Sequence, residues 1–310
     1  MRSIVTGGAG FIGSHIVDRL IDMGHEVIVV DNESSDAHEQ FYHNDKATYY
    51  KWDVGATEGM GYGILEMLFK DVDYVFHLAA ESRIQPTIEN PVRAVQTNVL
   101  GTCNILQAAR KHGVKRVVYS STSSAYGLAN PIPNKEDMIK DCLNPYSVSK
   151  TSGEELCQMY TKLFGLETVI FRYFNVYGER QPVKGQYAPV IGLFQRQHEE
   201  GEPMTIVGDG MQRRDFTHVS DVVEANILAA FSEDENVLGE IFNIGSGTNH
   251  NIHQLVSLVG GKKAEYVYIP ERPGESRETL SDCSKAHELL KWKPQMNVED
   301  WIKSCKKQLV

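Results

Sequence analysis

The sequence predicts the α/β class, with a doubly wound parallel sheet and a smaller C-terminal lobe. Short β-branched runs alternate with longer stretches of helical periodicity through the first 175 residues, as strands and crossover helices of a parallel sheet do. A glycine-rich turn follows the first of these runs directly. With 310 residues, 41% of them hydrophobic, the chain is long enough to bury a large core.

Six strands and four helices are predicted in this first part of the chain. The strand candidates are rich in valine, isoleucine, threonine and aromatic residues, which favour extended backbone. They cover residues 3–6, 27–30, 48–52, 74–77, 117–120 and 168–171. The helix candidates have apolar residues at helical spacing and cover residues 11–23, 64–69, 92–112 and 146–164.

The regular alternation fades after Asn175. Breaks rich in glycine or proline follow at residues 245–247 and 270–275, and a helix after Ser220 is expected to return the chain once to the sheet. The sequence therefore predicts a sheet domain of residues 1–174 plus about 216–244. The remaining segments, about 175–215 plus 245–310, are expected to build the smaller lobe.

Composition excludes several classes of partner and compartment. A formal charge of −10 disfavours nucleic acid and anionic membranes as main partners. Apolar runs stay shorter than the roughly 18 residues that cross a bilayer, and His15, Asp18 and Arg19 stand where a signal peptide needs an apolar core. The five cysteines form no C-x-x-C pair, so neither a metal site nor a disulfide framework is predicted. We expect a cytoplasmic protein.

The first turn has the pattern of a dinucleotide-binding site. It reads Gly7-Gly8-Ala9-Gly10-Phe11-Ile12-Gly13 and joins the first strand to the first helix. Glycine allows a tight turn and lets the backbone approach a pyrophosphate at the helix N-terminus. Asp31 ends the next strand, 21 residues after Gly10, where a carboxylate accepts from a ribose 2′-hydroxyl and repels a 2′-phosphate. This predicts a Rossmann-type domain that binds NAD rather than NADP, against the alternative of a purely structural glycine turn.

The end of the third strand offers a second contact to that cofactor. Asp53 and Val54 stand there and could bind the adenine amino group and ring. An aspartate at a strand end is as often a turn former, so both interpretations stay open.

A tyrosine and a lysine predict general-base chemistry. Tyr146 and Lys150 stand four residues apart on a helix, so both face the same side. An ammonium beside the phenol, together with an oxidised nicotinamide, lowers the pKa of the tyrosine and makes it a base for an alcohol. The hydroxyl-rich segment 120–127 ends the preceding strand, where Thr122 could bridge substrate and tyrosine, and Ser123 and Ser124 could bind neighbouring hydroxyls. The alternatives are a packed ring beside a solvated amine and a plain polar loop.

These motifs together resemble the extended short-chain dehydrogenase/reductases, and within them the nucleotide-sugar 4-epimerases that act on UDP-glucose and UDP-N-acetylglucosamine. The resemblance runs nearly end to end. Besides the glycine turn and the Tyr-x-x-x-Lys pair, it rests on His77-Leu78-Ala79-Ala80, Thr97-Asn98-Val99-Leu100-Gly101-Thr102, Arg172-Tyr173-Phe174-Asn175-Val176-Tyr177-Gly178 and Leu290-Lys291-Trp292-Lys293-Pro294. It implies NAD-dependent 4-epimerisation of a UDP-sugar through a transient 4-keto intermediate, with the smaller lobe binding the nucleotide sugar.

The resemblance also implies roles for individual residues. The cofactor would be bound by Gly7, Gly10, Phe11, Ile12, Gly13, Asp31, Asn32, Asp53, Val54, Leu78, Ala79, Ala80, Asn98, Ser120, Tyr146, Lys150 and Tyr173. The substrate would be bound by Arg83, Thr122, Ser123, Ser124, Asn175, Val190, Arg214, Arg272, Glu275 and Thr279. Among these, Asn175, Arg214 and Arg272 would hold the diphosphate, Val190 the base and Glu275 the ribose.

Two positions bear on the choice of substrate. Thr279 matches a position where a bulky tyrosine excludes N-acetyl sugars, so the preferred pair is UDP-N-acetylglucosamine and UDP-N-acetylgalactosamine, with UDP-glucose and UDP-galactose possible. Arg83 stands where many epimerases have a small or hydroxyl residue and could bind a uronate, which makes a UDP-glucuronate 4-epimerase the alternative. It could also simply pair with Glu81 or Glu89. A dehydratase of the family would need an Asp-Glu acid pair where Ser123 and Ser124 stand.

Other functions and the assembly stay open from the sequence. A reductase or dehydrogenase would consume external NAD(H), and an NAD-sensing module would not need Tyr146 and Lys150 in register. Helices 92–112 and 146–164 resemble those that form a four-helix homodimer interface in similar enzymes. Their apolar stripes could equally be buried within one subunit.

Overall fold

A seven-stranded parallel sheet forms the centre of the described chain. The computed structural model describes residues 1–38, 40–56, 60–184 and 188–308. The strands are β1 (Arg2–Thr6), β2 (Glu26–Asp31), β3 (Thr48–Lys51), β4 (Tyr74–His77), β5 (Arg116–Thr122), β6 (Glu167–Tyr173) and β11 (Ile241–Ile244). Their order is β11-β6-β5-β4-β1-β2-β3, with every neighbouring pair parallel. The six predicted strands are confirmed, and β11 adds a seventh.

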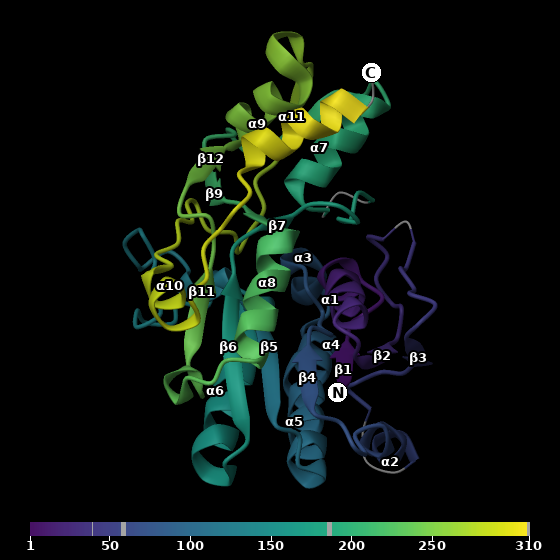
Figure 1. Ribbon diagram of the computed structural model, residues 1–310. Coiled ribbons are helices and arrows are strands. Elements are labelled where there is room, and N and C mark those ends of the chain that lie inside the picture. Colours follow the sequence, from purple (N-terminus) through teal and green to yellow (C-terminus); the bar gives the residue numbers. More distant parts are fainter. Residues whose placement is uncertain (39, 57–59, 185–187, 309–310) are drawn as a thin grey trace.

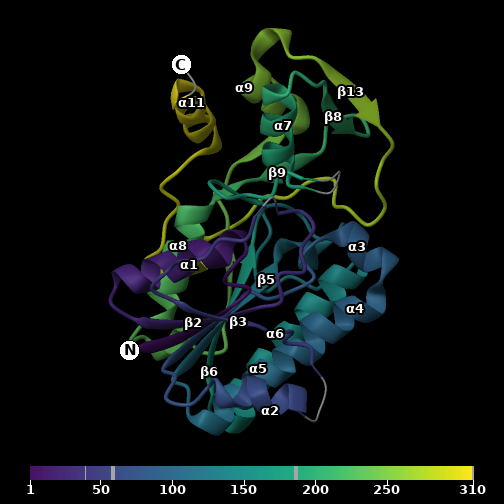
Figure 2. The ribbon, with the colours of Figure 1, turned by 90° about the vertical axis from the view of Figure 1, so that its right-hand side faces the viewer.

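Helices cover both faces of this sheet (Figures 1 and 2). Successive residues of β1 enter different cores: Val5 packs with α1 (Phe11–Asp22) and α8 (Val219–Ala230), whereas Ile4 packs with α5 (Gly101–His112) and α6 (Pro145–Phe164). Because both faces are buried, the strands read as continuous apolar runs. The shorter helices of the first half are α2 (Met60–Met67), α3 (Ile84–Glu89), α4 (Pro91–Val95), the π-helical η1 (Gln96–Leu100) and the 3-10 helix η2 (Ser123–Tyr126).

The smaller lobe lies beyond the carboxyl ends of the strands (Figure 1). Its strands form three two-stranded pairs: β7 (Val176–Tyr177) with β10 (Thr217–His218), β8 (Met204–Val207) with β13 (Tyr266–Ile269), and β9 (Arg213–Asp215) with β12 (Asn249–Asn251). Its helices are α7 (Val190–Glu199), α9 (Ile252–Gly260), η4 (Gly261–Lys263) and α11 (Val298–Gln308). Phe194, Leu255 and Trp301 lie in a separate core there.

One segment expected in the lobe packs with the sheet instead. Helix α10 (Ser284–Leu290) and Trp292 lie in the same core as α1 and α8, and the Trp292 Nε1 donates to the Asp221 carbonyl at 2.8 Å. The short 3-10 helix η3 (Glu235–Val237) precedes β11. Among the described residues, no helix has the length and hydropathy to span a membrane.

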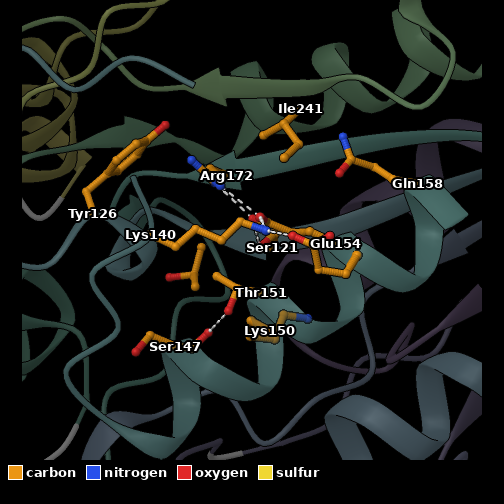
Figure 3. A network of polar contacts seen from close by, with 12 residues as sticks. Ser121, Tyr126, Lys140, Ser147, Lys150, Thr151, Glu154, Gln158, Arg172 and Ile241 are labelled. Atoms are coloured by element: carbon orange, nitrogen blue, oxygen red, sulfur yellow. Dashed lines mark hydrogen bonds and ion pairs between the residues drawn. The ribbon is translucent and has the colours of Figure 1, made fainter. Parts of the chain in front are cut away.

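A buried ion cluster ties β5, β6 and α6 together (Figure 3). The fully buried Glu154 accepts from Arg172 Nε at 2.9 Å and from its second guanidinium nitrogen at 2.8 Å. It also accepts from Ser121 Oγ at 2.6 Å and lies 3.1 Å from Lys140 Nζ. Burial opposes ionisation of Glu154, but these partners outweigh it and hold the pKa of the carboxyl below its usual value. The cluster therefore fixes α6 against the strand ends.

We expect Glu154→Leu to destabilise the fold strongly, because it leaves the Arg172 guanidinium buried without its partner. The free energy of unfolding from urea titration should fall by about 3–5 kcal/mol, and the double variant Glu154→Leu/Arg172→Met should recover part of the loss. Asp209→Ala is the control, since it breaks a half-exposed pair with Arg277 and should change stability little. A double variant no more stable than Glu154→Leu would contradict this account of the pair.

Candidate active site

One cavity collects nearly all the residues predicted for the site. It has a volume of about 550 Å³ and lies between the carboxyl ends of the sheet strands and the lobe. Every predicted cofactor and substrate residue lines it except two, Asp53 and Asn98. The parallel sheet thus brings residues far apart in the sequence to one edge, as expected for an open α/β fold.

The glycine turn packs too closely for side chains. Gly7 has φ of +70°, and a Cβ there would lie 2.8 Å from the Ala79 nitrogen. A Cβ on Gly13 would lie 2.1 Å from the Gly7 carbonyl oxygen. The Asp31 carboxylate accepts from the Ala9 nitrogen at 3.0 Å and the Glu33 nitrogen at 2.8 Å, which fixes it beside the turn. A dinucleotide fits this arrangement, because the turn presents bare glycine backbone with the Asp31 carboxylate beside it.

His38 contacts the start of α1, beside the glycine turn. The Phe11 nitrogen donates to His38 Nε2 at 3.2 Å, and His38 Nδ1 lies 2.9 Å from Ser35 Oγ. Burial lowers the pKa of His38, which favours the neutral imidazole as acceptor. The sequence reasoning missed this residue, because the segment after β2 has no periodicity. Trp52 and Phe216 also line the cavity and were not predicted. Trp52 directly follows β3, and this position at a strand end could have indicated it.

Tyr146 and Lys150 both face the cavity from α6, together with Thr122 from β5. Thr122 forms a side-chain hydrogen bond with Tyr146. Lys150 is 3% exposed, and its ammonium lies 4.4 Å from the centre of the Tyr119 ring. Helix α6 is fixed at this end because Asn144 accepts from the Ser147 nitrogen at 2.8 Å in a capping box.

Burial dominates the protonation of this pair. It raises the pKa of Tyr146 and outweighs the hydrogen bond from Thr122, which favours the phenolate. Burial also lowers the pKa of Lys150 to about 7, against the opposing field of Cys157 and Glu154. Burial therefore opposes the lowering of the Tyr146 pKa that is expected from Lys150 together with an oxidised nicotinamide. The reason is that a poorly solvated site disfavours both the phenolate and the ammonium.

Asp53 and Asn98 bind protein groups rather than line the cavity. Asp53 accepts from the Gly55 nitrogen at 2.8 Å and forms an ion pair with Arg93 at 2.9 Å. Asn98 accepts from the Glu81 nitrogen at 2.8 Å and donates to Ser149 Oγ at 2.9 Å. Both side chains thus hold neighbouring loops in place, and their contact with the cofactor stays a prediction.

Further polar and charged groups line the same cavity. Arg214 and Arg272 lie 3.7 and 4.0 Å from the Glu275 carboxylate. Asn175 Nδ2 lies 3.4 Å from Thr279 Oγ1, and Tyr173 accepts from Ser120 and Asn226 at 3.1 and 2.8 Å. Ser123, Ser124 and Val190, the first residue of α7, complete the predicted set.

Arg83 has an acidic partner at the cavity rim. Its guanidinium contacts the Asp36 carboxylate, in the segment that follows β2. Arg83 therefore lines the cavity as half of an ion pair.

Comparison with known proteins agrees with this geometry. The model of the NAD dependent epimerase/dehydratase family matches residues 3–245. A putative UDP-glucose 4-epimerase of Methanocaldococcus jannaschii is 40% identical over 305 residues, covering 97% of this chain and 95% of the relative. The structure of a UDP-glucose 4-epimerase from Thermotoga maritima with UDP-glucose matches with a TM-score of 0.90 and 37% identity, covering 100% of both chains.

A second solved structure shows the same fold with another sugar nucleotide. It is a UDP-N-acetylglucosamine 4-epimerase from Methanobrevibacter ruminantium in complex with UDP-N-acetylmuramic acid. The TM-score is 0.88 at 34% identity, covering 99% of this chain and 97% of that one. The resemblance read from the sequence is thereby confirmed. This chain belongs to the NAD-dependent epimerase/dehydratase family, alongside its UDP-sugar 4-epimerases, and its cofactor is NAD.

Proposed function

We propose that this protein interconverts the C4 epimers of a UDP-sugar, with UDP-N-acetylglucosamine and UDP-N-acetylgalactosamine as the preferred pair. The observation that carries the proposal is the shared cavity. A dinucleotide-binding turn, a tyrosine-lysine pair and two arginines all line it. These are the parts that a reversible oxidation of a diphosphate-linked sugar needs.

The cofactor would be held at the glycine turn. Gly10, Phe11 and Ile12 would face its pyrophosphate at the start of α1, and Asp31 would accept from its ribose hydroxyls. When bound, NAD supplies reversible hydride acceptance at the sugar C4. The remaining chemistry belongs to side chains of this chain.

Tyr146 would move the proton of the substrate 4-hydroxyl. It would take that proton directly or through Thr122, whose hydroxyl already bonds the phenol. Lys150 would favour the phenolate while it is charged, and a pKa of about 7 makes its charge sensitive to added negative or positive groups. Asn175, Arg214 and Arg272 would hold the diphosphate so that the sugar presents either face to the same base.

The choice of sugar rests on Thr279. This small side chain lines the cavity at 8% exposure, close to Asn175. Its size leaves room for a 2-acetamido group that a bulkier residue would exclude. One solved relative at 34% identity carries an N-acetyl sugar nucleotide, which supports the same choice.

UDP-glucuronate is the second candidate substrate, favoured by the presence of Arg83 in the cavity wall. Binding a uronate would require Arg83 to exchange its Asp36 partner for the substrate carboxylate. The Asp36 side chain is largely exposed, so this exchange would cost little. The acetamido sugar is preferred because of the small Thr279. A dehydratase is disfavoured, since hydroxyls at Ser123 and Ser124 replace the acid pair that water elimination needs.

We also propose a homodimer, with a four-helix interface built from two helical segments of each copy: the consecutive α4, η1 and α5 as one, and α6 as the other. These helices lie side by side on one outer face (Figure 2). They expose large apolar side chains: Val92 is 75% exposed, Leu163 67%, Val95 51% and Val148 50%. Such a patch is typical of a protein interface.

We expect Tyr146→Phe to lose epimerisation while it keeps its cofactor. Removing the proton-transferring hydroxyl should lower kcat by about a hundredfold or more. The NAD released on denaturation should equal that of the wild type, and neither protein should consume external NAD(H). Tyr160→Phe is the control, since its hydroxyl lies on the same helix and donates to Gln107 at 3.1 Å. Near-normal turnover of Tyr146→Phe would remove the proposed base.

We expect Thr279→Tyr to change substrate choice. The larger ring should fill the acetamido space, so the ratio of UDP-N-acetylglucosamine to UDP-glucose conversion should fall about tenfold or more. Proton NMR of the anomeric and C4 signals measures both conversions, and Thr279→Ser should keep the wild-type ratio. A wild type that converts only UDP-glucose, or a tyrosine variant with an unchanged ratio, would contradict the pocket argument.

We expect Val92→Asp to convert the dimer to a monomer. A charge within an apolar interface is costly to desolvate. Mass measurement by light scattering after gel filtration tests this, with Val267→Asp, exposed on β13, as the matched control. A wild type that is monomeric at micromolar concentration would exclude the proposed interface.

A further inference from the structure

Asp215, the last residue of β9, is a fully buried carboxylate surrounded by donors. One oxygen accepts from the Ser246 nitrogen and hydroxyl, both at 2.7 Å. The other accepts from the Gly247 nitrogen at 3.1 Å, the Ser281 nitrogen at 2.9 Å and the Ser281 hydroxyl at 2.6 Å. These contacts join the turn after β11 to the segment after Thr279, so one side chain links the sheet edge to the lobe.

The backbone of the same residue holds the side chains assigned to the nucleotide sugar. The Asp215 nitrogen donates to Thr279 Oγ1 at 3.2 Å, and its carbonyl accepts from Asn175 Nδ2 at 2.9 Å. Arg214 is the adjacent residue, and it lines the cavity, as do Thr279 and Asn175. Asp215 itself is not among the described residues that line the cavity. Asp215 thus lies behind three lining residues: Arg214, Thr279 and Asn175.

The donor arrangement requires a carboxylate. Each oxygen of Asp215 faces at least one backbone N–H, from Ser246 on one side and from Gly247 and Ser281 on the other. Hydroxyl hydrogens can turn away, but backbone hydrogens cannot. An asparagine in either orientation would set an NH₂ group against one of them. The backbone at Gly245 packs closely against this group, since a Cβ there would lie 2.2 Å from Ser281 Oγ and 3.0 Å from an Asp215 oxygen.

We propose that Asp215 is a positioning residue for the sugar nucleotide: its buried carboxylate, held by Ser246, Gly247 and Ser281, sets Arg214, Asn175 and Thr279 in the geometry that grips the diphosphate and the sugar. This inference rests on the proposed function. It adds to that function a residue that touches neither substrate nor cofactor, and it assigns the residue to binding rather than to the proton transfer at Tyr146.

The test compares two buried aspartates after the same change. Asp221→Asn is the matched control, because Asp221 is also buried and its oxygens accept from the backbone nitrogens of Gln295 and Met296 at 3.0 and 3.1 Å. Asp221 is not among the described lining residues. Both variants should lose stability in urea titration. Only Asp215→Asn should weaken binding, with the Kd for UDP in calorimetry and the KM for the UDP-sugar rising about tenfold, the size of one lost hydrogen bond to a charged group.

Other readouts separate positioning from general loosening. In Asp215→Asn, kcat and bound NAD should stay close to wild type. An unchanged Kd in folded Asp215→Asn, or an equal rise in Asp221→Asn, overturns the inference. If Asp215→Asn does not fold, Ser281→Ala removes one donor from the carboxylate and should raise the Kd several-fold with kcat kept, and an unchanged Kd overturns it equally. A wild type that binds UDP but turns over no UDP-sugar would reject the proposed function while the UDP comparison still decides the role of Asp215.

Discussion

The parallel register of the sheet is the constraint on which the site depends. When every strand of β1 to β6 runs the same way, each crossover returns the chain to the opposite edge, and all strand ends face one crevice. The glycine turn after β1, Asp31 at the end of β2 and Thr122 at the end of β5 therefore lie at the same edge of the sheet. The Glu154–Arg172 pair completes the arrangement, because it anchors α6, and with it Tyr146, to the same strands.

The lobe side of the cavity, proposed to bind the nucleotide sugar, is built by different means. Its strands β7, β9, β10 and β12 are two or three residues long and cannot fix geometry by a ladder alone. Side-chain hydrogen bonds fix the geometry instead. The hydrogen bonds around Asp215 join the segments near residues 175, 215, 246 and 280. The sheet side of the cavity thus combines close backbone packing at the glycine turn with the buried apolar cores. The lobe side depends more on a few directed hydrogen bonds, which a change of side-chain chemistry would break.

This difference explains how much of the molecule could be predicted. The strands of the sheet were readable because burial on both faces leaves unbroken apolar runs, and the glycine turn because its spacing follows from backbone geometry. Trp292 and α10 were placed in the lobe, since nothing local shows that a residue late in the chain packs beside α8. The loop contacts of Asp53 and Asn98 were not readable for a related reason: their partners, Arg93 and Ser149, lie far away in the sequence and are brought close only by the fold.

The protonation of the tyrosine-lysine pair shows what sequence spacing leaves out. A spacing of four residues on a helix places Tyr146 and Lys150 on the same side, but burial raises the pKa of the phenol and lowers that of the amine. In the chain alone the pair is therefore held near its neutral forms. A positive charge bound against the phenol would favour the phenolate, while anionic groups nearby would favour the ammonium. If Tyr146 is the base, as proposed, groups bound in the cavity would therefore act together with Lys150 in favouring its phenolate.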